Sequence, residues 1–208
     1  MALWGTAHAS ADNKPKYLPE DENSKYTKGD AYATQSGWVM QAGTAATGND
    51  NASATPEVLV AIGGLAGTSS STGLRAPTIT DMRFVVGTTA ATDLTAGSSS
   101  QTIQVELTWD EGVTVVGSPT IAVTNGNEGT GTGRGPYTLV YTATGSTANR
   151  KRFILASQTI AENDVLTLGT ANIQLAGGTI SDTVVGGTTL AASLDVSGLT
   201  DVTHTVLA

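Results

Sequence analysis

Residues 103–109 read IQVELTW, and every second side chain in this stretch is apolar. A period of two is typical of a β-strand that buries one face and exposes the other. The stretch ends at Asp110-Glu111-Gly112, whose residue types favour a turn. Residues 82–86 and 137–141 show the same alternation on either side of it. This part of the chain is therefore predicted to consist of short strands joined by tight turns.

Short apolar stretches of this kind recur up to the C-terminus, separated by Gly, Asn and Asp residues. No segment between them has the periodicity of a three-turn helix. Short strands at this spacing are typical of an antiparallel sandwich. We therefore predict an all-β fold in which residues 76–208 form an immunoglobulin-like antiparallel β-sandwich domain. The further strands are expected over residues 120–123, 152–155, 165–168, 173–175, 188–194 and 202–207.

Residues 1–75 have a different pattern, which predicts an extended, largely irregular N-terminal arm and a linker. Two short strands are expected in the arm, over residues 37–40 and 57–62. Residues 63–73 are rich in Gly, Ser and Thr, a composition typical of a linker. Because this third contains few aliphatic side chains, we expect it to lack a core and to gain order against another protein.

The chain carries a net charge of −8 over 208 residues and contains no cysteine. A nucleic-acid-binding surface needs clustered Lys and Arg, so no nucleic-acid partner is expected. The one dense basic run, Arg150-Lys151-Arg152, is interpreted as a solvated turn that enters a strand. The absence of cysteine excludes disulfides and zinc sites built on thiolates.

The first residues lack the basic and apolar regions of a secretory signal peptide. No apolar run is long enough to span a bilayer, so no membrane partner is expected. These features predict synthesis in a host cytoplasm.

Candidate catalytic residues are scarce in this sequence. Histidine, the usual general base near neutral pH, occurs only as His8 and His204. His204 lies in an alternating stretch, on the face of Val202 and Val206 or at an edge, and is interpreted as structural or exposed. No Gly-x-Ser-x-Gly nucleophile motif occurs, although a dispersed Ser-His-Asp arrangement stays open. The glycine-rich run 129–135 lacks the Lys-Ser/Thr of a phosphate loop and is interpreted as a hairpin tip.

Two acidic loops, at residues 110–111 and 162–164, offer the hard oxygen ligands that calcium prefers. Their spacing matches no EF-hand, and we interpret these carboxylates as solvated. Paired carboxylates for glycoside hydrolysis are a weaker alternative, because few aromatic residues could stack on a sugar. We therefore predict no catalytic residue, no cofactor and no metal ion, and hence a protein that is not an enzyme.

Three blocks of the C-terminal part are IQVELTWDEGVTVVGSPTIAV at 103–123, YTLVYT at 137–142 and IQLAGGTISD at 173–182. In this order they resemble a bacterial Ig-like repeat family that is found in large surface and adhesion proteins. The match covers roughly residues 100–185; it departs at Trp109, where the family has Phe, and at residues 183–187. The resemblance implies a β-sandwich module for adhesion or spacing, without an active site.

The N-terminal third contains MALWG at 1–5, KPKY at 14–17, GWV at 37–39 and EVLVAIGGL at 57–65. These short blocks are similar to virion structural proteins of marine bacteriophages of the cyanophage type. Together the two resemblances imply a virion protein of the capsid surface that decorates or cements the capsid. Its arm would bind the major capsid protein, with the copies homo-oligomeric or arrayed on the lattice, and the Ig-like domain would face outward.

The arm residues expected to contact the capsid are aromatic anchors and positive charges. An alternative stays open, in which the lysines are solvated and the tryptophans pack on the protein's own sandwich. Two other functions also stay open: a virion protein of the neck, tail or fibre, and a module whose loops, such as 125–136, bind carbohydrate on a host surface. The expected capsid-binding residues are Trp4, Lys14, Lys16, Tyr17, Lys25, Tyr26, Lys28 and Trp38.

Overall fold

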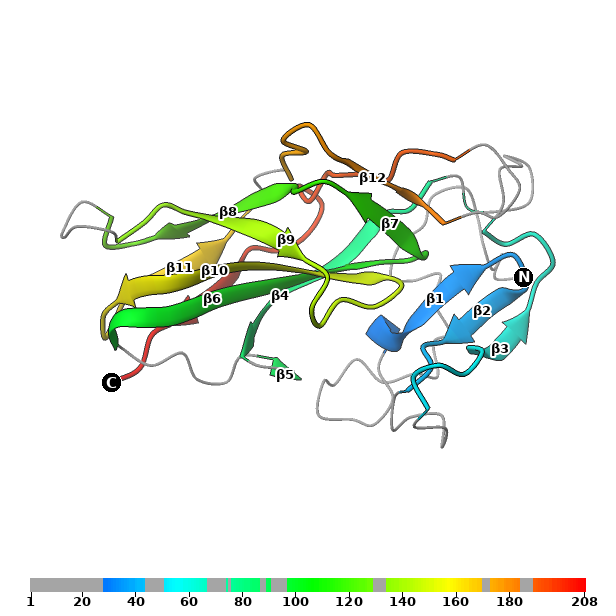
Figure 1. Ribbon diagram of the computed structural model, residues 1–208, viewed down its shortest axis with the longest axis horizontal. Coiled ribbons are helices and arrows are strands. Elements are labelled where there is room, and N and C mark those ends of the chain that lie inside the picture. The colour runs from blue at the N-terminus through cyan, green and yellow to red at the C-terminus, as the bar shows by residue number, and fades with distance from the viewer. Residues whose placement is uncertain are drawn as a thin grey trace.

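The computed structural model describes residues 28–43, 51–66, 74, 76–86, 89–90, 97–128, 134–169, 173–183 and 189–208. Over these residues the chain is all-β, as predicted, and a short 3-10 turn, η2 (Lys28–Asp30), precedes the first strand. The strands form a three-stranded, an eight-stranded and a two-stranded sheet (Figure 1). They are β1 (Ala31–Thr34), β2 (Gly37–Met40), β3 (Glu57–Ala61), β4 (Ile79–Val86), β5 (Thr89–Ala90), β6 (Gly97–Trp109), β7 (Val113–Val116), β8 (Thr120–Asn125), β9 (Tyr137–Thr142), β10 (Arg150–Ile160), β11 (Val165–Leu168), β12 (Thr179–Asp182) and β13 (Val202–Thr205).

The large sheet is antiparallel and has the strand order β13-β11-β8-β9-β10-β6-β4-β5. Strand β6 lies between β10 and β4, so that Leu107 is opposite Lys151 on one side and Met82 on the other. The alternation at residues 103–109 therefore gives one apolar face, because successive side chains of a strand point to opposite faces. The side chains of that face are Ile103, Val105, Leu107 and Trp109, all fully buried. The polar face is also largely buried, at Glu106 and Thr108.

The large sheet folds over on itself, which gives this part of the chain the character of a β-sandwich. The His204 ring on β13 lies 6.0 Å from the Phe84 ring on β4, although these strands lie far apart in the strand order. Strand β13, which carries His204, is an edge strand of this sheet, and the sequence also placed His204 on a strand face or at an edge. One core fills the space between the two halves, and its largest buried side chains include Trp109, Tyr137 and Phe153. The immunoglobulin-like type of this sandwich stays a prediction.

Two of the predicted strands, at residues 173–175 and 188–194, are not formed in the described part of the chain. Gln174 and Ala191 make only isolated bridges, to β8 and β12 respectively. Two strands that the sequence did not indicate, β7 and β12, pair with each other instead. The chain around the two isolated bridges buries apolar side chains at the margin of the core, although it forms no strand there. These side chains are Ile173, Ala192 and Val196.

The N-terminal third has a small core, so the expectation that it lacks one is wrong for the described residues. The predicted strands at 37–40 and 57–62 are confirmed as β2 and β3, and β1 completes a sheet with the order β1-β2-β3. Trp38 is fully buried there and packs against Leu65, Ala66 and Leu74. Leu65 and Ala66 belong to the stretch interpreted as a linker, whose Gly-rich composition masked its apolar residues.

This small sheet is bonded directly to the sandwich. The backbone amide of Ala33 on β1 donates to the carbonyl of Asp110 at 2.7 Å, just after β6 ends. Asn149 Nδ2 donates to the carbonyl oxygens of Gly29 and Trp109, each at 3.0 Å. Arg150 Nε also donates to the Gly29 carbonyl at 3.2 Å. The end of β6 and the start of β10 therefore determine where the small sheet lies.

Replacing Asn149 with Ala removes both bonds of its amide, which joins the small sheet to β6. We expect a loss of roughly 1–3 kcal/mol in the free energy of unfolding, because the buried bond to the Trp109 carbonyl and the bond to the Gly29 carbonyl are both lost. Hydrogen exchange measured by mass spectrometry should accelerate in residues 31–40 and stay slow in residues 103–109. The exposed substitution Thr138→Ala on β9 serves as the control; equal exchange in both variants would contradict the docking role.

Candidate functional site

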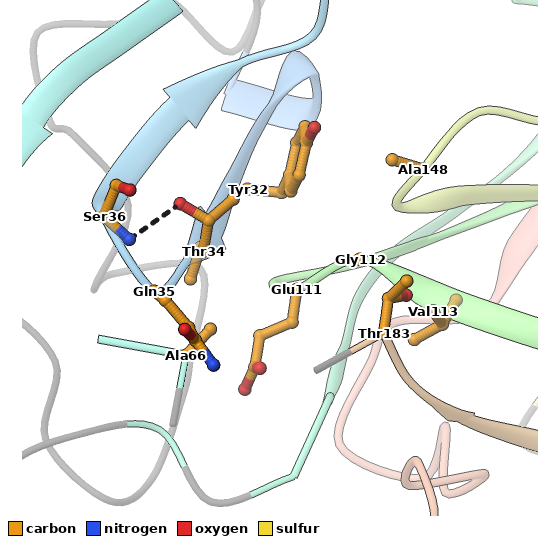
Figure 2. A pocket seen from close by; sticks show the side chains of 11 residues that line it. Tyr32, Thr34, Gln35, Ser36, Ala66, Glu111, Gly112, Val113, Ala148 and Thr183 are labelled. Atoms are coloured by element: carbon orange, nitrogen blue, oxygen red, sulfur yellow. Dashed lines mark hydrogen bonds between the residues drawn. The ribbon is translucent and has the colours of Figure 1, made fainter. Parts of the chain in front are cut away.

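A cavity of about 400 Å³ lies where the small sheet meets the sandwich (Figure 2). One wall is the hairpin turn between β1 and β2, and the opposite wall is the loop from Asp110 to Gly112 that joins β6 to β7. The volume is within the usual range for pockets that hold small molecules. Its lining combines polar groups with small apolar side chains, which is also typical of such pockets.

The hairpin wall is held in place by local hydrogen bonds. Thr34 Oγ1 donates to the Gly37 carbonyl at 3.1 Å and accepts from the Ser36 amide at 3.2 Å (Figure 2). Gly37 has a φ of +125°, and a Cβ at this position would lie 2.1 Å from the Val60 carbonyl oxygen. Only glycine avoids that clash. The turn therefore presents Gln35 and Ser36 to the cavity in a defined position.

The opposite wall places a carboxyl group in the cavity. Asp110 anchors this wall, since its Oδ1 accepts from the Thr78 amide at 2.7 Å and its carbonyl accepts from Ala33. Glu111 follows directly, and Figure 2 shows its side chain turned toward the side of the cavity where Gln35 and Ala66 lie. The expectation that residues 110–111 are solvated is wrong, because both carboxylates are buried under the small sheet.

Glu111 is the electrostatically unusual group of this cavity. Its side chain is only 3% exposed, and Oε1 has no hydrogen-bond partner among the described residues. Burial, together with the nearby charges of Asp110 and Asp182, raises the pKa of Glu111 to about 8. Burial also raises the pKa of Tyr32, which lines the cavity. Near neutral pH the empty site therefore holds a largely protonated carboxyl group.

In the second acidic loop Glu162 is exposed, as expected, whereas Asp164 is buried at the other end of the sandwich. Asp164 accepts hydrogen bonds from Asn125 Nδ2 at 3.0 Å, from Asn127 Nδ2 at 2.9 Å, from the Ala161 amide at 3.0 Å and from Arg134. Burial alone would raise the pKa of Asp164, but these donors outweigh it and lower the pKa to about 2. This carboxylate fastens the loop after β8 to the turn before β11, so it is a structural group.

The basic run at 150–152 lies inside strand β10, so its interpretation as a solvated turn is wrong. Arg152 Nε donates to Glu106 Oε2 at 3.1 Å, and Arg83 Nη2 donates to Glu106 Oε1 at 2.7 Å. Arg150 lies 3.7 Å from the same carboxylate and 3.1 Å from Asp30. Burial lowers the pKa of Lys151 to about 8, and its ammonium donates to the Thr147 carbonyl. The three positive charges of residues 150–152 are therefore paired or hydrogen-bonded within the fold.

Most of the capsid-binding residues expected from the sequence lie outside the described part of the chain: Trp4, Lys14, Lys16, Tyr17, Lys25 and Tyr26. Lys28 is the first residue of η2. Trp38 is buried against residues of the N-terminal part itself, and not on the sandwich as the alternative reading expected. His8 and residues 129–133 of the glycine-rich run also lie outside the described residues.

Of the residues that line the cavity, only Glu111 stands out in the sequence as a candidate ligand, and the sequence does not predict that this side chain is buried. Tyr32, Gln35 and Ser36 carried no signal, because a β1–β2 hairpin was not predicted there. Among the described residues, no group of three His, Cys, Asp or Glu side chains is placed to hold a metal ion. No helix in the described ranges is long and apolar enough to cross a membrane.

Comparison with known proteins adds no relative to this picture. No protein-family model, no curated protein and no solved structure matches the chain.

Replacing Glu111 with Gln should change how stability depends on pH. Because its pKa in the folded chain lies above the unfolded value of about 4.3, the folded state binds the proton more tightly. The stability of the unsubstituted protein should therefore fall as pH rises from about 4.5 to about 8, by at most roughly 1.4 kcal/mol per pH unit.

Thermal unfolding at pH 5 and pH 8.5 tests this expectation. Glu111→Gln should melt near the unsubstituted protein at pH 5 and clearly above it at pH 8.5. Glu162→Gln removes an exposed carboxylate and should change neither temperature by much. Parallel pH profiles of the unsubstituted protein and Glu111→Gln would show that Glu111 ionises normally.

Replacing Asp164 with Asn should loosen the far end of the sandwich. An amide offers one acceptor oxygen where the carboxylate offers two, so we expect a loss of roughly 2 kcal/mol at pH 7. The pKa of Asp164 is depressed, so its contribution is present above about pH 4 and is lost as pH falls through 2. Urea unfolding should therefore show a larger deficit at pH 7 than at pH 2, whereas Asp201→Asn, at an exposed position, should show none.

Proposed function

We propose that this chain is a non-enzymatic structural protein of a bacteriophage virion, which decorates or cements the capsid. In this proposal the N-terminal residues bind the major capsid protein, and the β-sandwich is displayed outward from the capsid surface. The short N-terminal blocks that resemble cyanophage virion proteins, and the blocks at 103–182 that resemble Ig-like repeats, support it. The all-β fold is consistent with a display module of this kind.

The observation that carries the proposal is the separation of two ends along the longest axis of the molecule. Strands β1 to β3 lie at one end, whereas the C-terminus and the turn between β10 and β11 lie at the other (Figure 1). The N-terminal segment joins the described chain at Lys28, which is the first residue of η2 next to the small sheet. Attachment through that segment leaves the opposite end of the sandwich pointing away from the attachment surface.

The sequence of residues 1–27 suits attachment to a lattice. Trp4, Tyr17 and Tyr26 can each gain roughly 1.5–3 kcal/mol when they are buried in a partner. Lys14, Lys16 and Lys25 contribute register and rate of encounter with acidic capsid rims more than affinity. Repetition of the same contacts over a lattice makes detachment slow. Trp38 is not part of this proposal, because it is buried in the small sheet.

A specific observation also favours a second candidate, binding of carbohydrate at the outward end. There hydrogen bonds to Asp164 hold the side chains of Asn127 and Arg134 in place. Ordered amides and guanidinium groups are suited to binding sugar hydroxyls. A glycan array on the full chain tests this candidate, and Asp164→Asn should abolish any specific signal.

Binding to particles that lack this protein tests the main proposal. Trp4→Ala combined with Tyr17→Ala should weaken co-sedimentation of the full chain with such particles by at least about 10-fold, because two buried anchors are lost. Leu207→Ser, an exposed change at the opposite end, is the matched control and should bind normally.

Quantitative mass spectrometry of intact particles gives the copy number. Hundreds of copies per particle indicate the capsid lattice, whereas a single ring of copies indicates a neck or tail position and contradicts decoration. Unchanged binding of the Trp4 and Tyr17 variant would contradict attachment through the N-terminal residues.

A further inference from the structure

The cavity between the small sheet and the sandwich contains a carboxyl group that the fold itself does not use. Glu111 is 3% exposed and its Oε1 lacks a hydrogen-bond partner among the described residues. Leaving a buried polar atom unpaired costs about 1–3 kcal/mol. Glu111 lines a cavity of about 400 Å³, so a ligand in the cavity can pair with its carboxyl group.

We propose that this cavity is a binding site for a primary alkylammonium group, with Glu111 as the carboxylate that pairs with it. The group can belong to a free amine or to a lysine side chain of another protein, since both present the same –CH₂–NH₃⁺ chemistry. This site is separate from the N-terminal attachment proposed above and does not depend on it.

The charge around the cavity selects a cation. Asp110 and Asp182 are buried close enough to Glu111 to disfavour its negative charge, and the described residues that line the cavity include no Lys or Arg. An anionic ligand would add to this repulsion, whereas a cation relieves it. A neutral ligand could bond to the protonated carboxyl but would not offset the charges of the two aspartates.

The kind of cation follows from the donor set. A divalent metal ion requires several oxygen ligands in a defined shell, and among the described residues no three His, Cys, Asp or Glu side chains are placed to hold one. An ammonium group needs only three acceptors. Glu111 supplies the charged one, and Gln35 and Ser36 from the hairpin turn add oxygens to the lining.

The remainder of the cavity fits the carbon chain of such a ligand. Ala66, Val113 and Ala148 line it with small apolar side chains, and Figure 2 shows Val113 and Ala148 on the sandwich side. An alkyl stem lies against such a surface while its charged head reaches a polar group. Burial of each methylene adds roughly 0.8 kcal/mol to binding.

Binding at this site must be linked to a proton. The titratable groups around Glu111 are Asp110, Asp182 and Tyr32. Because the pKa of Glu111 is about 8, its carboxyl group must release a proton to pair with an ammonium ion. Affinity should therefore rise by roughly 20-fold between pH 6.5 and pH 8.5, a range in which an alkylamine stays protonated.

Isothermal titration of the full chain with n-butylammonium chloride, at constant ionic strength, tests the proposal. We expect a dissociation constant in roughly the millimolar range at pH 8.5, since the ligand is very small. Glu111→Gln should weaken binding at least about 10-fold, and Glu162→Gln, which removes an exposed carboxylate, should not. Ala148→Leu should also weaken it, because the larger side chain fills the cavity. Circular dichroism confirms that each variant is folded.

Two further ligands test whether the positive charge is required and whether the ammonium group comes from a free amine or from a protein lysine. n-Butanol has a similar shape without the charge, and binding as tight as that of butylammonium would overturn the proposal. Unchanged affinity in Glu111→Gln, or no pH dependence, would overturn it as well. Nα-acetyl-lysine N-methylamide tests the source: binding comparable to butylammonium supports a protein lysine, whereas binding of butylammonium alone supports a free amine.

Discussion

The pairing of β6 with β10 on one side and β4 on the other is the constraint on which the rest of the structure depends. One face of this ladder contributes Ile103, Val105 and Leu107 to the main core. On its other face the carboxylate of Glu106 is shared by arginines from both neighbouring strands. A slip of one residue would exchange the two faces, place Glu106 in the apolar core and move the apolar side chains to the face of the arginines. The register is therefore strongly determined by both faces.

The end of the same ladder determines the junction with the small sheet. Where β6 stops, the Asp110 carbonyl pairs with β1, and Asn149 beside the start of β10 holds the turn η2. This arrangement buries two consecutive carboxyl groups, Asp110 and Glu111, and the fold uses the first as an anchor. The second is buried at an energetic cost without a partner in the described chain. Uncompensated burial of an ionisable group often marks a binding site.

The two proposals use different parts of one elongated molecule. Attachment concerns the residues that precede Lys28, while the cavity is formed by side chains from β1, the β1–β2 turn and the loop after β6. The Asp164 cluster orders the opposite end, which faces outward if the chain is attached to a capsid. The cavity wall and the Asp164 cluster are stabilised by separate sets of hydrogen bonds, so a substitution in one should leave the other folded.

The sequence by itself determined the all-β class, most strands of the sandwich and its buried face, because a period of two along a strand is local information. It also singled out the acidic pair 110–111 and the basic run 150–152, but it could not show that both are buried. Their environment is created by residues far away in the chain: Tyr32 and Gln35 approach Glu111, and Arg83 shares Glu106 with Arg152. Likewise Trp38 is buried because Leu65 and Leu74, which follow much later in the chain, pack against it. Burial and charge pairing depend on which segments meet in space, and only the tertiary structure decided that.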